Sequence, residues 1–120
     1  MASILTHARY VLLADDRRVN FASDRRFQLW AYKVGHAQLL LRSVKGDGHQ
    51  TRLDVLFKNV HRVELPTLMQ GLVIAERPDG GYDLSGDGWG GQVQAGACVT
   101  AEDAGEYFDP SPFAETIGDV

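Results

Sequence analysis

The side chains best suited to acid–base chemistry lie close together in the middle of the chain. His49 stands between Asp47 and Asp54, and a histidine beside carboxylates can exchange a proton with a bound molecule near neutral pH. However, residues 45–49 (Lys-Gly-Asp-Gly-His) have the composition of a glycine-rich hairpin turn. Water reaches such a turn freely, so the sequence predicts an exposed turn and no general acid or base.

Cys98 is the one cysteine and therefore the one candidate thiol nucleophile. A reactive thiol needs a nearby cation or a helix N-terminus to lower its pKa, and no lysine or arginine follows Arg77. Cys98 also lies in an alternating segment typical of a β-strand, on the polar side of that segment. We expect a structural thiol in a protein that folds without an internal disulfide in a reducing cytoplasm.

The remaining motifs give little support to a metal or phosphate site. Residues 86–91 (Gly-Asp-Gly-Trp-Gly-Gly) are as glycine-rich as a phosphate-binding loop, but they contain no lysine and precede a strand-like segment rather than a helix. We interpret them as a connector with Trp89 at its tip, either exposed as a contact residue or folded back onto the core. The sequence predicts no metal and no cofactor, because no HxH or HxxxH spacing occurs among the four histidines, His7, His36, His49 and His61.

The charges of the chain are divided sharply at Pro78. Residues 1–77 hold all 12 basic side chains and seven acidic ones, a net charge of +5, whereas residues 78–120 hold nine acidic side chains and no basic one, a net charge of −9. The total of −4 conceals this division. Such a split predicts complementary surfaces, either within one chain or between two.

Length and composition indicate a single bacterial cytoplasmic domain. A chain of 120 residues with 44% apolar and 23% charged residues suits one globular domain. No run of 18 apolar residues exists, so no membrane span is expected, and the first residues lack the pattern of a secretory signal. Arginine outnumbers lysine nine to three, a bias typical of a GC-rich bacterial genome.

Two glycine-rich turns organise the middle of the chain into a three-stranded antiparallel meander. The dipeptide at 35–36 (Gly-His) suits a two-residue type II′ turn, whose first position needs a positive φ, and it pairs Tyr32 with Leu39. A second turn centred on Asp47 pairs Leu39 with Val55. Both registers place the same residues on one predicted core face: Trp30, Tyr32, Val34, Ala37, Leu39, Leu41, Leu53, Val55 and Phe57.

Further strand-like segments define the fold class and the domain organisation. Residues 60–65, 71–77, 82–85 and 92–102 read as strands, the last with Val93, Ala95, Ala97, Val99 and Ala101 pointing inward. We predict a mainly β, single small domain, in which an antiparallel meander of about seven strands forms a partly open barrel or a two-layer roll. The chain divides into an N-terminal part (1–26), a β core (27–102) and an acidic tail (103–120), and residues 4–13 fit either a helix or a strand.

The opposite face of the meander mixes cations with leucines. The predicted registers set Arg42 opposite Arg52, a like-charge pair that is destabilising unless an anion lies nearby. The face is either solvated or covered by an anionic partner, which could be the acidic third of the same chain, a second subunit or an external ligand. The predicted interface consists of Leu29, Lys33, Leu40, Arg42, Arg52, Leu56, Lys58 and Trp89.

The sequence therefore predicts a non-enzymatic bacterial cytoplasmic protein that acts through protein–protein contacts or homodimerisation. The alternative is a small-ligand or nucleic-acid binding module that uses the basic sheet face. Nucleic acid is the weaker partner, because the pI is about 5.4 and Asp15, Asp16 and Asp24 flank the arginine pairs at 17–18 and 25–26. No membrane partner is expected.

Overall fold

The computed structural model describes residues 18–46 and 48–106, and these form eight strands and one short 3-10 turn. The predicted helix or strand at residues 4–13 and the tail beyond residue 106 lie outside the described residues. The strands are β1 (Arg18–Lys33), β2 (Gln38–Ser43), β3 (Arg52–Lys58), β4 (Arg62–Glu64), β5 (Leu68–Glu76), β6 (Gly81–Gly86), β7 (Trp89–Gln94) and β8 (Ala97–Asp103), with the turn η1 (Val34–His36) between β1 and β2.

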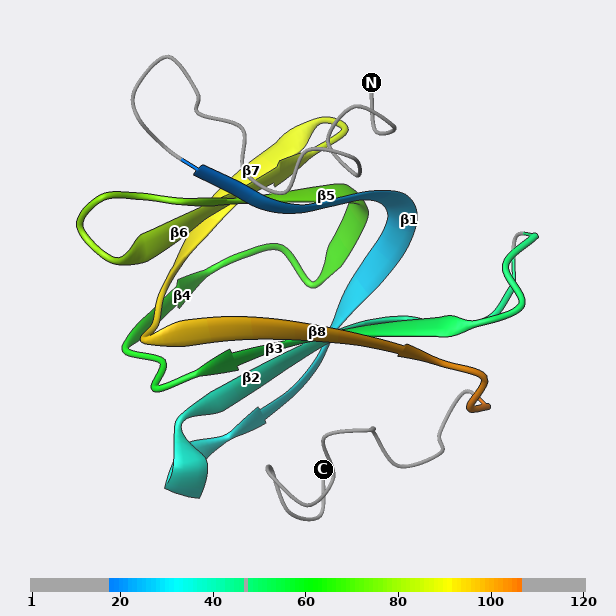
Figure 1. The fold of residues 1–120 in the computed structure, drawn as a ribbon, viewed down its shortest axis with the longest axis horizontal. Coiled ribbons are helices and arrows are strands. Elements are labelled where there is room, and N and C mark those ends of the chain that lie inside the picture. Colours follow the sequence, from blue (N-terminus) through cyan, green and yellow to red (C-terminus); the bar gives the residue numbers. More distant parts are fainter. Residues whose placement is uncertain (1–17, 47, 107–120) are drawn as a thin grey trace.

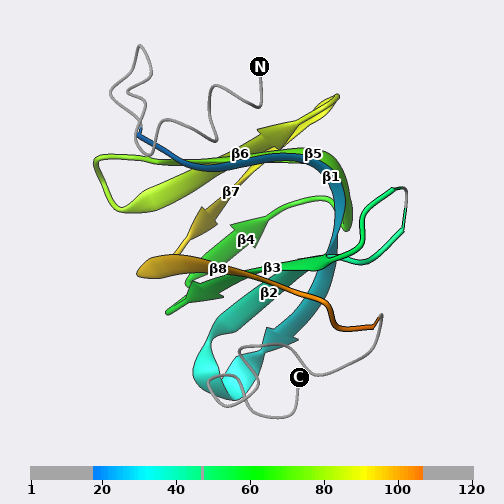
Figure 2. The same ribbon diagram turned by 45° about the vertical axis from the view of Figure 1, so that its right-hand side comes forward.

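All eight strands belong to one antiparallel sheet in the order β4-β7-β6-β5-β1-β2-β3-β8. The long strand β1 pairs with β5 through its first part and with β2 through its last part, so it joins two layers of the folded sheet (Figure 1, Figure 2). Because β4 and β8 end the sheet at opposite edges, it is not closed into a barrel. The predicted β roll is thus confirmed, and the sheet already includes residues from Arg18 onward, ahead of the predicted start of the β core at residue 27.

The main hydrophobic core lies between the two layers. Leu39, Leu41, Val55 and Phe57 are fully buried in it, as the meander pattern predicts. The ring of Phe57 on β3 meets that of Tyr82 on β6 edge-to-face, with centroids 5.5 Å apart, and this contact joins one layer to the other. Burial in this contact raises the pKa of Tyr82 to about 12.

A bulge at Trp30 corrects the predicted face of β1. Tyr32 pairs with Leu39 as expected, but the register shifts between Leu29 and Ala31, so Leu41 lies opposite Leu29 instead of Trp30. An extra residue in one strand reverses the direction of every side chain beyond it. Leu29 therefore packs on the main core and Trp30 on the opposite face.

The end of the first hairpin also differs from the prediction. The loop forms the 3-10 turn η1, and the left-handed residue is Ala37 (φ 50°) rather than the glycine of a type II′ turn. This loop is longer than the predicted two-residue turn and is built on a turn of type I character. It leaves Tyr32 45% and Val34 81% exposed, so the prediction that these two side chains belong to the core is wrong.

The second hairpin is shifted by two residues from the predicted register. Leu41 lies opposite Val55, and Arg42 lies opposite Asp54 instead of Arg52. A shift of two residues keeps every side chain on its predicted face, because the side-chain period of a strand is two. It does change the partners across the pair, and the predicted repulsion between two arginines is replaced by an ion pair.

The glycine-rich segment 86–91 is a tight hairpin rather than a connector. Asp87 and Gly88 form the turn between β6 and β7, Gly88 adopts a left-handed φ of 74°, and Gly86 pairs with Trp89. An Asp-Gly pair between alternating residues favours this geometry.

The following strand is also interrupted, between β7 and β8 at residues 95–96. Val93 and Ala95 point into the core as predicted, but Cys98 packs on the core in place of Ala97 and Val99.

The other expected strands are confirmed. Residues 60–65 contain β4, residues 71–77 overlap β5, and residues 82–85 lie within β6. In the described part of the chain, the helical element η1 is far too short to cross a bilayer.

Candidate functional site

The predicted basic face is not an open surface. Leu40 and Leu56 are buried in a second, smaller cluster against Trp30 and Ala31. Arg42 and Arg52 are each only 2% exposed. The remaining predicted interface residues are only partly exposed: Leu29, Lys33, Lys58 and Trp89. The sequence predicts the composition of this face correctly, but its central residues are inside the protein and cannot form a binding surface as they stand.

The centre of this face is a bidentate ion pair between neighbouring strands. Arg42 on β2 donates from Nε to Asp54 Oδ1 at 2.8 Å and from a terminal nitrogen to Oδ2 at 3.1 Å. Asp54 is 1% exposed. The guanidinium carbon of Arg42 also lies 4.8 Å from the ring centroid of Trp30, a distance at which a cation is attracted to an indole. The bulge that turns Trp30 to this face therefore supplies a cover for the buried charge.

Acidic residues of the C-terminal third pair with basic residues of the same chain. Arg52 donates two hydrogen bonds to Asp103, at 2.9 and 2.8 Å, and a third to the backbone carbonyl of Glu106 at 3.1 Å. Lys45 pairs with the Glu106 carboxylate at 2.8 Å. The hydrogen bond from Arg52 holds the pKa of Asp103 below its usual value. For these pairs, the complementary charges meet within one chain.

Trp89 is a packing residue rather than an exposed contact. Its indole Nε1 donates to the backbone carbonyls of Gln70 and Gly71, both at 3.2 Å. The ring packs on the main core. A side chain on Gly86 would collide with the indole nitrogen, so glycine at position 86 allows Trp89 to fold back. The second of the two alternatives for Trp89 is the one that the structure shows.

The structure does not bring together the residues that were considered as candidates for catalysis. Cys98 packs against the core, and burial raises its pKa to about 12, so the thiolate that a nucleophile needs is scarce at neutral pH. Asp54 is paired with Arg42 inside the protein, whereas His49 lines a groove elsewhere. Among residues 18–46 and 48–106, no cluster of three or more His, Cys, Asp or Glu side chains could hold a metal ion.

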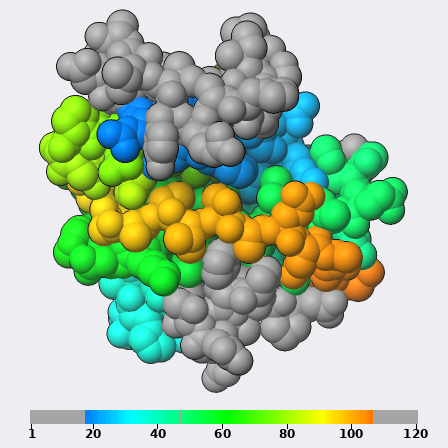
Figure 3. Space-filling model, viewed as in Figure 1, coloured from blue at the N-terminus to red at the C-terminus, as the bar shows by residue number. Residues whose placement is uncertain are grey.

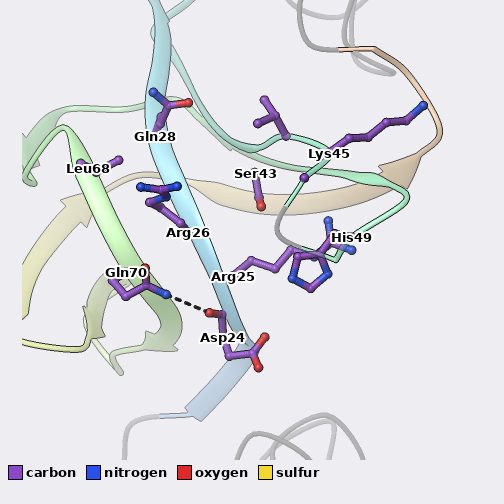
Figure 4. A pocket seen from close by; sticks show the side chains of 11 residues that line it. Asp24, Arg25, Arg26, Gln28, Ser43, Lys45, His49, Leu68 and Gln70 are labelled. Carbon is purple, nitrogen blue, oxygen red and sulfur yellow. Dashed lines mark hydrogen bonds between the residues drawn. The ribbon is translucent and has the colours of Figure 1, made fainter.

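A polar groove with a volume of about 600 Å³ lies where β1, β5 and the β2–β3 hairpin meet. Cations outnumber carboxylates on its walls, since Arg25, Arg26 and Lys45 accompany Asp24. Figure 4 shows the Ser43 hydroxyl directed into the space between Arg26 and His49, while Lys45 extends away from it. The other lining residues are Gln28, Val44, Gly46, Leu68 and Gln70. The size is that of a small-molecule site.

No pattern in the sequence reveals this groove. Its two arginines are visible in the sequence as the pair at 25–26, which the nucleic-acid hypothesis includes. The groove forms only because β1 lies beside both β5 and β2, so Gln70 and Ser43 approach from opposite sides. The β1–β5 pairing joins segments far apart in sequence, and no local pattern signals it.

The two edges of the sheet are protected very differently. β4 is only three residues long, carries exposed Arg62 and Glu64, and is soon followed by Pro66. Short length, charge and proline are the usual devices that prevent an edge strand from pairing with another chain. β8 is seven residues long and contains no lysine, arginine or proline. It crosses the surface of the molecule in the view of Figure 3, and Val99 on it is 36% exposed.

Comparison with known proteins supplies no relative. No family model, curated protein or solved structure matches the chain. The groove, the sheet edge and the charges of the chain itself are therefore the features that bear on its function.

Proposed function

We propose that this is a non-enzymatic cytoplasmic protein that acts through protein–protein contact, and that it forms a homodimer by pairing β8 with the β8 strand of a second copy. The observation that carries the proposal is the contrast between the two sheet edges. β4 has three features that oppose pairing, whereas β8 is seven residues long and, among the strands of the described residues, pairs on one side only. A sheet edge of this length, uncharged over residues 97–101, is a template for another strand.

A two-fold antiparallel pairing of β8 can avoid repulsion between the carboxylates of the two strands. With Thr100 opposite its own copy, Glu102 faces Cys98 and Asp103 faces Ala97 of the second copy. No two carboxylates lie directly opposite each other, so the repulsion that like charges cause in cross-strand pairs is avoided. Glu102 and Asp103 also remain paired with Arg25 and Arg52 of their own chain. The dimer would continue one sheet across both subunits.

The position of Cys98 makes the dimer independent of oxidation. In this register the two Cys98 residues face Glu102 rather than each other, and each thiol packs on its own core. The contact therefore needs no intersubunit disulfide, which fits a reducing compartment. A reducing agent should leave the oligomeric state unchanged.

The experiment is sedimentation velocity over a range of concentrations, on the wild-type chain and on Val99→Lys. A lysine on an edge strand opposes strand pairing, so the variant should sediment as a monomer where the wild type is dimeric. Val34→Lys is the matched control, because it makes the same change at a side chain 81% exposed in η1, away from β8. Circular dichroism confirms that each variant is folded.

Two outcomes would contradict the proposal. A wild-type chain that is monomeric at every concentration removes the dimer altogether. A dimer that Val99→Lys leaves intact, or that Val34→Lys disrupts equally, places the contact elsewhere on the molecule.

A further inference from the structure

Ser43 has an unusual position in the polar groove. The residue is only 3% exposed, yet its hydroxyl points into the groove (Figure 4). Among residues 18–46 and 48–106 this hydroxyl has no hydrogen-bond partner, and its oxygen, unlike the buried Gln38 Oε1, is not sealed from solvent. A hydroxyl that reaches an open groove without a partner of its own is available to a bound molecule.

The groove also holds a rigidly placed cation. The Arg25 side chain is 10% exposed, and its terminal nitrogens donate to the backbone carbonyl and the hydroxyl of Thr51, both at 2.8 Å. The Glu102 carboxylate lies further away, at 3.4 Å. Because these bonds fix the guanidinium before any ligand arrives, little side-chain entropy is lost on binding.

Arg26 and His49 also line the groove. Figure 4 shows Arg26 on one side of Ser43 and His49 on the other, and both line the groove together with Arg25. Asp24 is the one carboxylate among the described lining residues. The wall therefore combines two guanidinium groups with a neutral hydroxyl donor, groups that can recognise an oxyanion.

We propose that this groove is a binding site for a small molecule that carries an oxyanion, a phosphate or a carboxylate. The Ser43 hydroxyl donates to the oxyanion, and Arg26 supplies charge beside it. Asp24, at the far end of the labelled side chains, can accept a hydrogen bond from a hydroxyl or amine elsewhere on the same molecule. The site is separate from the β8 edge, so it does not depend on the proposed dimer.

Several features favour a small ligand over a nucleic acid. The groove is bounded on three sides by β1, β5 and the β2–β3 hairpin, and its volume of about 600 Å³ suits a single small molecule. A nucleic-acid track needs a row of cations with few acids. Here Asp24 lies in the groove, Glu102 is beside Arg25, and the whole chain has a net charge of −4.

The test is an NMR titration of the full chain in Tris chloride at constant ionic strength, with inorganic phosphate and acetate as probes. Amide signals of residues 24–28 and 43–46 should shift in a saturable manner with at least one of the two probes. Ser43→Ala and Arg26→Gln should each weaken binding about tenfold, the effect of losing one hydrogen bond or charge to an anion. Arg62→Gln is the matched control, since Arg62 is exposed on β4 outside the groove.

Ser43→Ala separates binding from folding. Because the hydroxyl makes no hydrogen bond within the described chain, its removal should leave the thermal midpoint of unfolding nearly unchanged. Weaker binding by a variant of normal stability supports a direct contact with the ligand.

The following results would overturn the proposal. One is the absence of saturable shifts with either probe. Another is binding that Ser43→Ala and Arg26→Gln leave unchanged, or that Arg62→Gln weakens equally. A third is tighter binding of a short single-stranded RNA than of phosphate, with shifts that extend well beyond the groove, because that result would indicate a nucleic-acid surface. Vesicles containing an anionic lipid provide a further arm: binding to vesicles but not to free phosphate would assign the oxyanion to a membrane surface.

Discussion

Removing the charge of Asp54 should destabilise the protein severely while leaving its shape unchanged. In Asp54→Asn the Arg42 guanidinium stays 2% exposed but loses the carboxylate that receives two of its hydrogen bonds, at 2.8 and 3.1 Å. Breaking a buried pair by removing one partner costs about 3–5 kcal/mol. This is a large share of the roughly 5–15 kcal/mol that stabilises a domain.

The loss of unfolding free energy in Asp54→Asn should lower the thermal midpoint of unfolding. At about 4 °C for each kcal/mol in a domain of this size, the expected decrease is roughly 12–20 °C. Urea unfolding followed by tryptophan fluorescence gives the free energy directly, and Trp30 lies over the affected guanidinium. Asp79→Asn is the matched control, because Asp79 makes an exposed pair with Arg77 and should contribute little.

The double variant Arg42→Met/Asp54→Leu distinguishes an unpaired charge from lost packing. If the single variant is unstable because a buried charge has lost its partner, then replacing both charges with apolar side chains should recover most of the stability. A double variant as unstable as the sum of its two single variants would refute this explanation. So would an Asp54→Asn variant that loses less than about 1 kcal/mol, the range of surface pairs.

Two further predictions concern titratable groups on β8. The Arg52 hydrogen bond lowers the pKa of Asp103 in the folded state, so the pair stabilises the protein above the unfolded pKa of about 4, and this stability is lost as the pH falls through the folded pKa. Unfolding free energies measured from about pH 2 to 6 should show a smaller acid-induced decrease in Asp103→Asn, and an unchanged pH profile would contradict the assignment. For Cys98, whose pKa is about 12, the thiol should react slowly with Ellman's reagent at about pH 8 in the folded protein and rapidly in guanidinium. Fast reaction in the folded protein would show that the thiol is accessible.

The β class and much of the core could be predicted from the sequence because the side-chain period of a strand is local information. Leu39, Leu41, Val55 and Phe57 alternate in two neighbouring strands, and an error of two residues in the register did not change their face. The bulge at Trp30 could not be predicted in the same way. The bulge directs Leu29 to the main core and the Trp30 indole to the buried Arg42 guanidinium. Both are contacts between different strands, so no local pattern in the sequence indicates them.

The burial of the predicted basic face could not be predicted from the sequence, for a related reason. Arg42, Asp54 and Arg52 are charged, and charged residues on alternate positions of an antiparallel strand usually indicate a solvated face. Here each arginine is matched to a carboxylate on a neighbouring strand, Arg42 to Asp54 and Arg52 to Asp103. Pairing makes burial of charge tolerable, and pairing depends on a register that composition does not specify. The polar groove is a further consequence of long-range pairing.

The division of charge along the chain also bears on the proposed pairing of β8. Arg25, Arg52 and Lys45 pair with Glu102, Asp103 and Glu106, all at or beyond the C-terminal end of the strand. The preceding residues 97–101 carry no charge. The ion pairs of these three basic side chains thus bind the acidic C-terminal end of β8 and the residues that follow it within the same chain.

An association driven by complementary charges would weaken as salt screens it. An association through the uncharged part of β8 depends on backbone hydrogen bonds and small side chains, and it should persist in high salt. Sedimentation of the wild-type chain at low and high salt therefore separates the two mechanisms. A dimer that dissociates when salt is added would mean that charged residues outside β8 form the contact, and the strand-pairing model would then be wrong even though the protein is a dimer.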